Sequence, residues 1–65
     1  MNTATIGSEE VRKFGEHGHK NRVYVADKSG NIYSISQSDW VLRASKKFHK
    51  HEAMFVGRAP VEVLQ

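Results

Sequence analysis

The clearest hydrophobic pattern lies in residues 22–36, RVYVADKSGNIYSIS, where two runs of β-branched and aromatic residues flank the turn sequence DKSG. Such side chains suit a pleated surface, and Asp at the first turn position with Gly at the fourth is typical of a type I turn. A three-residue loop that ends on a left-handed Gly30 sets Val25 opposite Tyr33 and Asp27 opposite Asn31. The pattern predicts a β-hairpin whose core face carries Val23, Val25, Tyr33 and Ile35.

The other face of this predicted hairpin carries Tyr24, Ala26, Ile32 and Ser34. If a helix covers only the core face, Tyr24 and Ile32 are exposed together. An exposed apolar pair of this kind suits a dimer interface or a surface on which another ring can stack.

A helical period follows the hairpin. Ser36 with Asp39 three residues later fits a capping box, and Ser38 is a second candidate cap. At about 100° per residue, one apolar stripe contains Trp40, Val41, Ala44 and Phe48. The pattern predicts a main amphipathic helix that runs to about Lys50 or Glu52 and covers the sheet.

The two ends of the chain carry weaker patterns. Residues 1–7 are mostly small and polar and predict a flexible tail. Ser8 can cap a short helix with an acidic first turn and with Val11 and Phe14 on one face. After the main helix, AMFVG and VEVL predict two short strands or one bent strand, and GRAP predicts a turn or bulge because Pro60 cannot donate to a central ladder.

These elements predict an α+β fold, in which an antiparallel sheet carries a helix on one face. Its elements in chain order are a short N-terminal helix, the hairpin, the main amphipathic helix and the C-terminal strand or strands. Residues 1–7 form the tail and residues 8–65 a single small domain.

Length and composition limit how this domain can be stabilised. In a chain of 65 residues the hydrophobic gain and the ordering cost nearly cancel, and with no cysteine neither disulfides nor thiolate metal sites are available. Self-association is therefore the favoured extra support, which predicts a homo-oligomer. The absence of cysteine and of a secretory signal fits the cytoplasm, and no apolar run is long enough to predict a membrane protein.

The net charge of +3 favours acidic partners. On the predicted main helix one face carries a basic row, with His49 beside it, that consists of Arg43, Lys46, Lys47 and Lys50. The row suits contacts with nucleic-acid phosphates, but it is somewhat more typical of the solvent side of a helix whose C-terminus favours cations. Because no Asn or Gln lies among these four positions, we expect phosphate contacts without base reading.

Other candidate chemistry is sparse. Trp40 suits either the core or an exposed role in stacking or in an interface. Two His-x-His pairs, formed by His17, His19, His49 and His51, could direct two rings at one metal only outside a helix, and we predict no metal site or other cofactor. No nucleophile elbow, phosphate loop or acid/base pair appears, so the chain is not predicted to be an enzyme.

Three functions remain open. The preferred one is a small non-enzymatic module whose basic row binds nucleic acid without strong sequence specificity. The alternative is a protein-binding inhibitor or adaptor, of the kind that mobile elements and phages encode, acting on an acidic protein surface. The third is a structural subunit of a larger assembly, in which the face with Tyr24 and Ile32 is buried.

Overall fold

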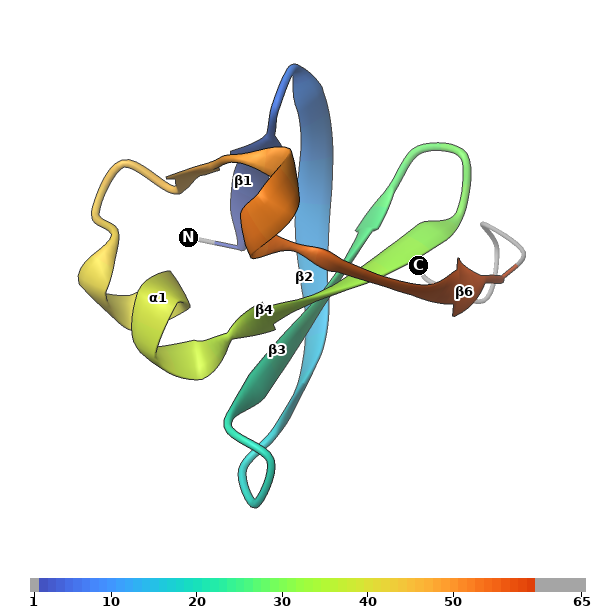
Figure 1. Ribbon diagram of the computed structural model, residues 1–65. Helices are drawn as coiled ribbons and strands as arrows, with labels where there is room; N and C mark the ends of the chain where they lie inside the picture. Colours follow the sequence, from blue (N-terminus) through green and yellow to red (C-terminus); the bar gives the residue numbers. More distant parts are fainter. Residues whose placement is uncertain (1, 60–65) are drawn as a thin grey trace.

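The computed structural model describes residues 2–59 and contains one six-stranded sheet that curves into a half-barrel (Figure 1). The strands are β1 (Thr3–Ile6), β2 (Glu9–His17), β3 (Arg22–Asp27), β4 (Asn31–Ser36), β5 (Lys47–Phe48) and β6 (Met54–Arg58). Their order in the sheet is β5-β1-β2-β3-β4-β6, and only β1 and β5 pair in parallel. The remaining elements are the helix α1 (Gln37–Leu42) and the 3₁₀ turn η1 (Lys50–Glu52). The fold is mostly β and mixed, so the predicted α+β class with an antiparallel sheet is wrong.

The predicted hairpin is confirmed as β3 and β4. Val25 pairs with Tyr33 and Val23 with Ile35, and Gly30 has a φ of 89°. The backbone N–H of Gly30 donates to the carbonyl of Asp27 at 3.2 Å, which closes the turn. The hairpin was predictable because turn chemistry and side-chain alternation are local and agree with each other.

The predicted N-terminal helix is wrong, because residues 9–17 form the long strand β2. Within the stretch predicted to be a tail, Thr3–Ile6 form strand β1, which pairs with β2 through the two-residue turn Gly7-Ser8. Gly7 has a φ of 63°, a conformation that glycine adopts readily at the first position of a tight hairpin turn. Val11 then lies between β1 and β3 and is almost fully buried. Pairing on both sides therefore outweighs the helical spacing of Val11 and Phe14.

The predicted main helix is also wrong beyond its first six residues. α1 begins after Ser36 as predicted, although the Ser36 side chain makes no capping hydrogen bond. The helix ends at Leu42, because the backbone of Arg43 is extended and that of Lys46 is left-handed. Val41, which the helical stripe placed in the core, is 68% exposed.

Two contacts explain why the chain turns back. In a continuous helix Trp40 and Phe48 would be separated by about 12 Å along the axis. Here their rings stack with centroids 5.8 Å apart, and both side chains are buried. The return also brings β5 beside β1, and the N–H groups of Thr5 and Gly7 donate to the carbonyls of Lys46 and Phe48. The chain thus buries the two aromatic rings and satisfies one edge of the sheet.

From β5 the chain passes through η1 and crosses to the opposite edge of the sheet, where β6 pairs with β4 (Figure 1). β6 confirms the strand predicted at AMFVG, but Gly57 and Arg58 belong to this strand and not to a turn. The predicted strand VEVL and Pro60 lie outside the described residues.

The sheet has two faces with different contents. Its inner face packs into a core with α1 and β5, and this core consists of Ala4, Ile6, Val11, Val23, Val25, Ile35, Trp40 and Phe48. Residues paired across strands share a face, so the register defines the opposite side. We call it the outer face, and in β2, β3, β4 and β6 it carries Glu10, Arg12, Phe14, His17, Arg22, Tyr24, Ala26, Ile32, Ser34 and Met54.

Candidate functional site

The predicted basic row does not exist as one surface, because its four residues belong to different elements. Arg43 is half-buried and is held by contacts within its own chain. Its Nη1 donates to Oε1 of Glu52 at 2.6 Å and to the carbonyl of Lys47 at 3.1 Å, and its guanidinium lies 5.1 Å from the centre of the Phe48 ring. Its charge therefore holds the segment between α1 and β6 in place and is largely neutralised by Glu52.

The other three cations of the predicted row do not share one helical face. Lys46 donates to the carbonyl of Trp40 and its ammonium lies 4.8 Å from the centre of the Trp40 ring. Lys47 lies in β5, and Lys50 lies in η1 against Gly7. Lys47, His49 and Lys50 are exposed. A phosphate backbone cannot follow them as it would follow one helical face.

The Arg43–Glu52 pair makes stability depend on pH. The hydrogen bond from Arg43, joined by one from the backbone N–H of His49, lowers the pKa of Glu52 from its ordinary value of 4.5 to about 2. Because the pKa is lower in the folded state, the ionised carboxylate stabilises the fold above pH 4.5, and this contribution is lost as pH falls towards 2.

We therefore expect the free energy of unfolding of the wild type to fall between pH 4.5 and 2 more steeply than that of Glu52→Gln. Urea denaturation followed by Trp40 fluorescence at a series of pH values measures this difference. Glu16→Gln is the matched control, since Glu16 forms the other ion pair of residues 2–59, an exposed contact with Lys13 at 3.5 Å. Equal pH profiles for the wild type and Glu52→Gln would contradict the assigned role of Glu52.

The histidines remain two separate pairs. The rings of His17 and His19 lie 6.4 Å apart at the end of β2, and those of His49 and His51 stack with centroids 5.4 Å apart near η1. Within residues 2–59 no three His, Cys, Asp or Glu side chains are grouped to hold a metal ion. This part of the chain also has no helix with the length and apolar character that a membrane crossing requires.

Two residues were predicted as candidates for stacking, Trp40 and Tyr24, and they differ in burial and location. Trp40 is only 6% exposed and belongs to the core. Tyr24 lies on the outer face, where it pairs with Ser34 of β4 and with Gly15 of β2. Ile32 lies diagonally from Tyr24 on this face, and both side chains are half-buried.

Phe14 adds a second aromatic ring to the outer face. The register between β2 and β3 shifts between Lys13 and Gly15, so Phe14 is the extra residue of a β-bulge opposite Tyr24. Lys13 is on the inner side, with its ammonium 6.0 Å from the Trp40 ring, and alternation then directs Phe14 outwards. The Phe14 side chain is 44% exposed. The two rings therefore come from adjacent strands and face the same side.

Two arginines flank these rings. Arg22 lies two residues before Tyr24 on the same face, and it is fixed by hydrogen bonds from Nε to the Ser34 hydroxyl at 2.6 Å and from Nη2 to the Ser34 carbonyl at 2.9 Å. Arg12 pairs with Ala26 on the other side of Tyr24 and is exposed. Neither arginine belongs to the two ion pairs found among residues 2–59. The outer face thus combines aromatic rings with cations that remain available to an anion.

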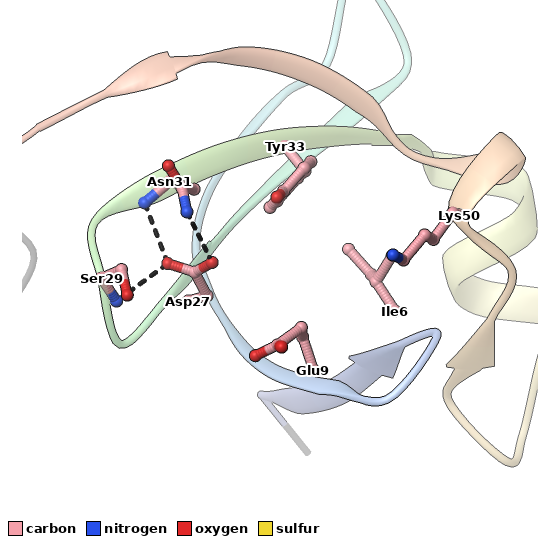
Figure 2. Close-up of a pocket in the computed structure, with 7 residues that line it drawn as sticks. All are labelled: Ile6, Glu9, Asp27, Ser29, Asn31, Tyr33 and Lys50. Atoms are coloured by element: carbon pink, nitrogen blue, oxygen red, sulfur yellow. Dashed lines mark hydrogen bonds between the residues drawn. The ribbon is translucent and has the colours of Figure 1, made fainter.

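A first groove, of about 380 Å³, opens between the tip of the β3–β4 hairpin and η1 (Figure 2). We call it the hairpin groove, and it is lined by Ile6, Glu9, Asp27, Ser29, Asn31, Tyr33 and Lys50. Partial burial favours a higher pKa for Asp27, but hydrogen bonds from the Asn31 side chain and the backbone N–H groups of Asn31, Ser29 and Gly30 outweigh it and hold the pKa below its usual value. Two carboxylates against one ammonium make this groove unsuitable for an anion.

A second groove, of about 320 Å³, lies along the other edge of the sheet. We call it the edge groove, and it is lined by Thr3, Ala4, Thr5, Glu10, Ala44, Ser45, Lys46 and Lys47. It offers hydroxyl groups and one carboxylate, that of Glu10. Since Thr3 pairs with Arg12 and Thr5 with Lys47, the edge groove adjoins the outer face.

Comparison with known protein families, curated proteins and solved structures finds no match for this chain. The candidate site is therefore inferred from the geometry of this chain alone. Of its residues, Tyr24 was identified from the hairpin register. Arg12 and Phe14 were missed as residues of this site because the predicted N-terminal helix concealed the alternation of β2. Arg22, at the start of the predicted hairpin, was not assigned to a site on the outer face.

Proposed function

We propose that this protein is a small non-enzymatic module that binds single-stranded nucleic acid on the outer face, without strong sequence specificity. The observation that supports it is the placement of Phe14 and Tyr24 on adjacent strands between Arg12 and Arg22. Aromatic rings on a sheet surface stack with unpaired bases, and arginines beside them contact phosphates. The lack of cysteine fits a cytoplasmic location, where such a strand is accessible.

The preference for a single strand follows from the rings. In a duplex the base faces are covered by their neighbours, so Phe14 and Tyr24 would have no base face on which to stack. Stacking tolerates every base because every base has a π-face. The outer face as described carries no Asn, Gln, Asp or Glu in β3, β4 or β6 that could read a base edge.

Salt dependence tests the role of the arginines. We expect the affinity for a labelled oligo-dT to fall steeply with salt, with a slope of about −0.7 per phosphate contacted, and Arg12→Gln to reduce the slope by about one such contact. Fluorescence anisotropy at several salt concentrations measures this slope. Lys28→Gln is the matched control, since Lys28 is an exposed cation in the β3–β4 turn. An unchanged slope in Arg12→Gln would contradict the assigned contact.

A second candidate function is protein binding, which one observation favours. The strand β6 lies at an edge of the sheet and carries three consecutive exposed apolar residues, Met54, Phe55 and Val56. Edge strands of this kind pair with an extended segment of a partner. A stable complex with another protein, together with no measurable affinity for any nucleic acid, would favour this inhibitor or adaptor role.

The third function, assembly through the face with Tyr24 and Ile32, fits the electrostatics less well. If two copies packed outer face to outer face, Arg12 and Arg22 of both copies would approach one another. Glu10 is the one acidic residue that the register places near them. Burying like charges without partners is costly, so this face is better suited to an anionic partner than to a second copy.

A further inference from the structure

We propose that the edge groove binds a phosphate group of the same nucleic-acid strand and so extends the outer-face site to β5. This inference rests on the proposed function. It assigns a ligand chemistry to a groove that the sequence did not reveal, because the groove is formed only when β5 pairs with β1.

The register makes the groove continuous with the arginine-flanked rings. Thr3 lies beside Arg12, and Thr5 lies between Glu10 and Lys47, all on the outer side of the sheet. Neighbouring strands are about 4.8 Å apart, so Tyr24 in β3 and Lys47 in β5 are three spacings, about 14 Å, apart across the sheet. They are also offset by about five residues, roughly 16 Å, along the strands, because Tyr24 pairs with Gly15 whereas Lys47 lies level with Glu10. An oligonucleotide whose base stacks on Tyr24 can therefore place in the groove a phosphate several nucleotides further along the strand.

The lining of the groove suits a phosphate. Thr3, Thr5 and Ser45 supply hydroxyl donors, and Lys47 supplies an exposed ammonium group that is in neither of the two ion pairs of residues 2–59. Lys46 also lines the groove, but its ammonium is directed at the carbonyl of Trp40. Hydroxyls and an ammonium are groups that commonly contact phosphate oxygens.

Glu10 makes the inference sharply testable because its carboxylate opposes an anion in the groove. If a phosphate occupies the edge groove, removing the negative charge of Glu10 strengthens binding, whereas removing the positive charge of Lys47 weakens it. A folding defect would weaken binding in both variants. Changes of affinity in opposite directions in the two variants therefore distinguish an effect on binding from an effect on folding.

The chain offers a matched control for each change. Glu9 is adjacent to Glu10 in the sequence but lines the hairpin groove, and Lys28 lies in the β3–β4 turn. Glu9→Gln and Lys28→Gln change the net charge as Glu10→Gln and Lys47→Gln do. At near-physiological salt, charges more than about 8 Å from the ligand are largely screened, so only residues near the strand should have full effects.

The experiment measures the affinity for a fluorescein-labelled ten-nucleotide oligo-dT by anisotropy at 150 mM salt, for the wild type and the four variants. We expect Lys47→Gln to weaken binding about two- to five-fold, Glu10→Gln to strengthen it by a similar factor, and both controls to change it less. Equal shifts in test and control variants, or no shift in Lys47→Gln and Glu10→Gln, would overturn the phosphate site.

Tyr24→Ala, measured in the same series, distinguishes this failure from failure of the proposed function. If Tyr24→Ala weakens binding but the groove variants behave like their controls, the outer-face site stands and the strand does not enter the groove. If the wild type shows no binding, or Tyr24→Ala has no effect, the proposed function fails and the phosphate site fails with it.

Discussion

Phe48→Ala is expected to lower the free energy of unfolding by about 3–5 kcal/mol, the usual cost of truncating a buried aromatic residue to alanine. The Phe48 ring is 3% exposed, stacks on Trp40 and lies beneath the guanidinium of Arg43. Because a domain of this size has a total stability of only a few kcal/mol, much of the variant should be unfolded at 25 °C. Urea denaturation followed by far-UV circular dichroism measures the loss.

Val41→Ala is the control that separates the observed fold from a continuous helix. In a helix extending to Lys50, Val41 would lie in the same apolar stripe as Trp40 and Phe48, and its truncation would be costly. In this structure Val41 is 68% exposed, so its replacement should change the stability by less than about 0.5 kcal/mol. A loss of stability in Val41→Ala comparable to that in Phe48→Ala would favour the continuous helix and contradict the placement of β5.

The sequence predicted the part of the fold in which local and non-local forces agree. In the hairpin of β3 and β4, the turn residues, the side-chain alternation and the register are all determined by 15 consecutive residues, 22–36. The segment after Ser36 is different, since helical spacing in α1 continues past Leu42 while the core requires Phe48 to return to Trp40. That competition is decided by pairing between β1 and β5, about 40 residues apart in the chain, which no local pattern contains.

The sequence of the first hairpin, formed by β1 and β2, also contains a local strand-and-turn pattern. Ala4 and Ile6 alternate with Thr residues, and Gly7-Ser8 is a two-residue turn with glycine first, typical of a type II′ hairpin. The acidic pair after Ser8 favoured a helix start instead. With β2 assigned as a helix, Arg12 and Phe14 could not be placed beside Tyr24, and the candidate site was assigned to the basic row.

The candidate site illustrates how charge spacing misleads when the element is wrong. Four cations in residues 43–50 form a face only on a helix. In the structure Arg43 pairs with Glu52 and Lys46 donates to the carbonyl of Trp40. Two of the four charges therefore make contacts within the protein. Of the cations on the outer face, Arg22 lies two residues before Tyr24 in β3, whereas Arg12 reaches the same face only through the register between β2 and β3.

Tyr24→Ala is expected to weaken the binding of single-stranded oligo-dT by about 10-fold or more. Stacking of one base on an aromatic side chain contributes about 1–3 kcal/mol, and truncation removes that contribution while the arginines remain. Phe14→Ala should have a smaller effect in the same direction, because Phe14 is 44% exposed whereas Tyr24 is half-buried, so fewer contacts hold the Phe14 ring in a stacking position. Anisotropy titrations at fixed salt measure both losses.

Phe55→Ala is the matched control for these changes. Phe55 is also an exposed aromatic residue, 57% exposed, but it pairs with Tyr33 and therefore lies on the inner side of the sheet, away from Arg12 and Arg22. A nucleic acid held by the outer face should be bound equally well by Phe55→Ala and the wild type. If Phe55→Ala lost as much affinity as Tyr24→Ala, the ligand would follow β6 and its edge, and the outer face would lose its assignment.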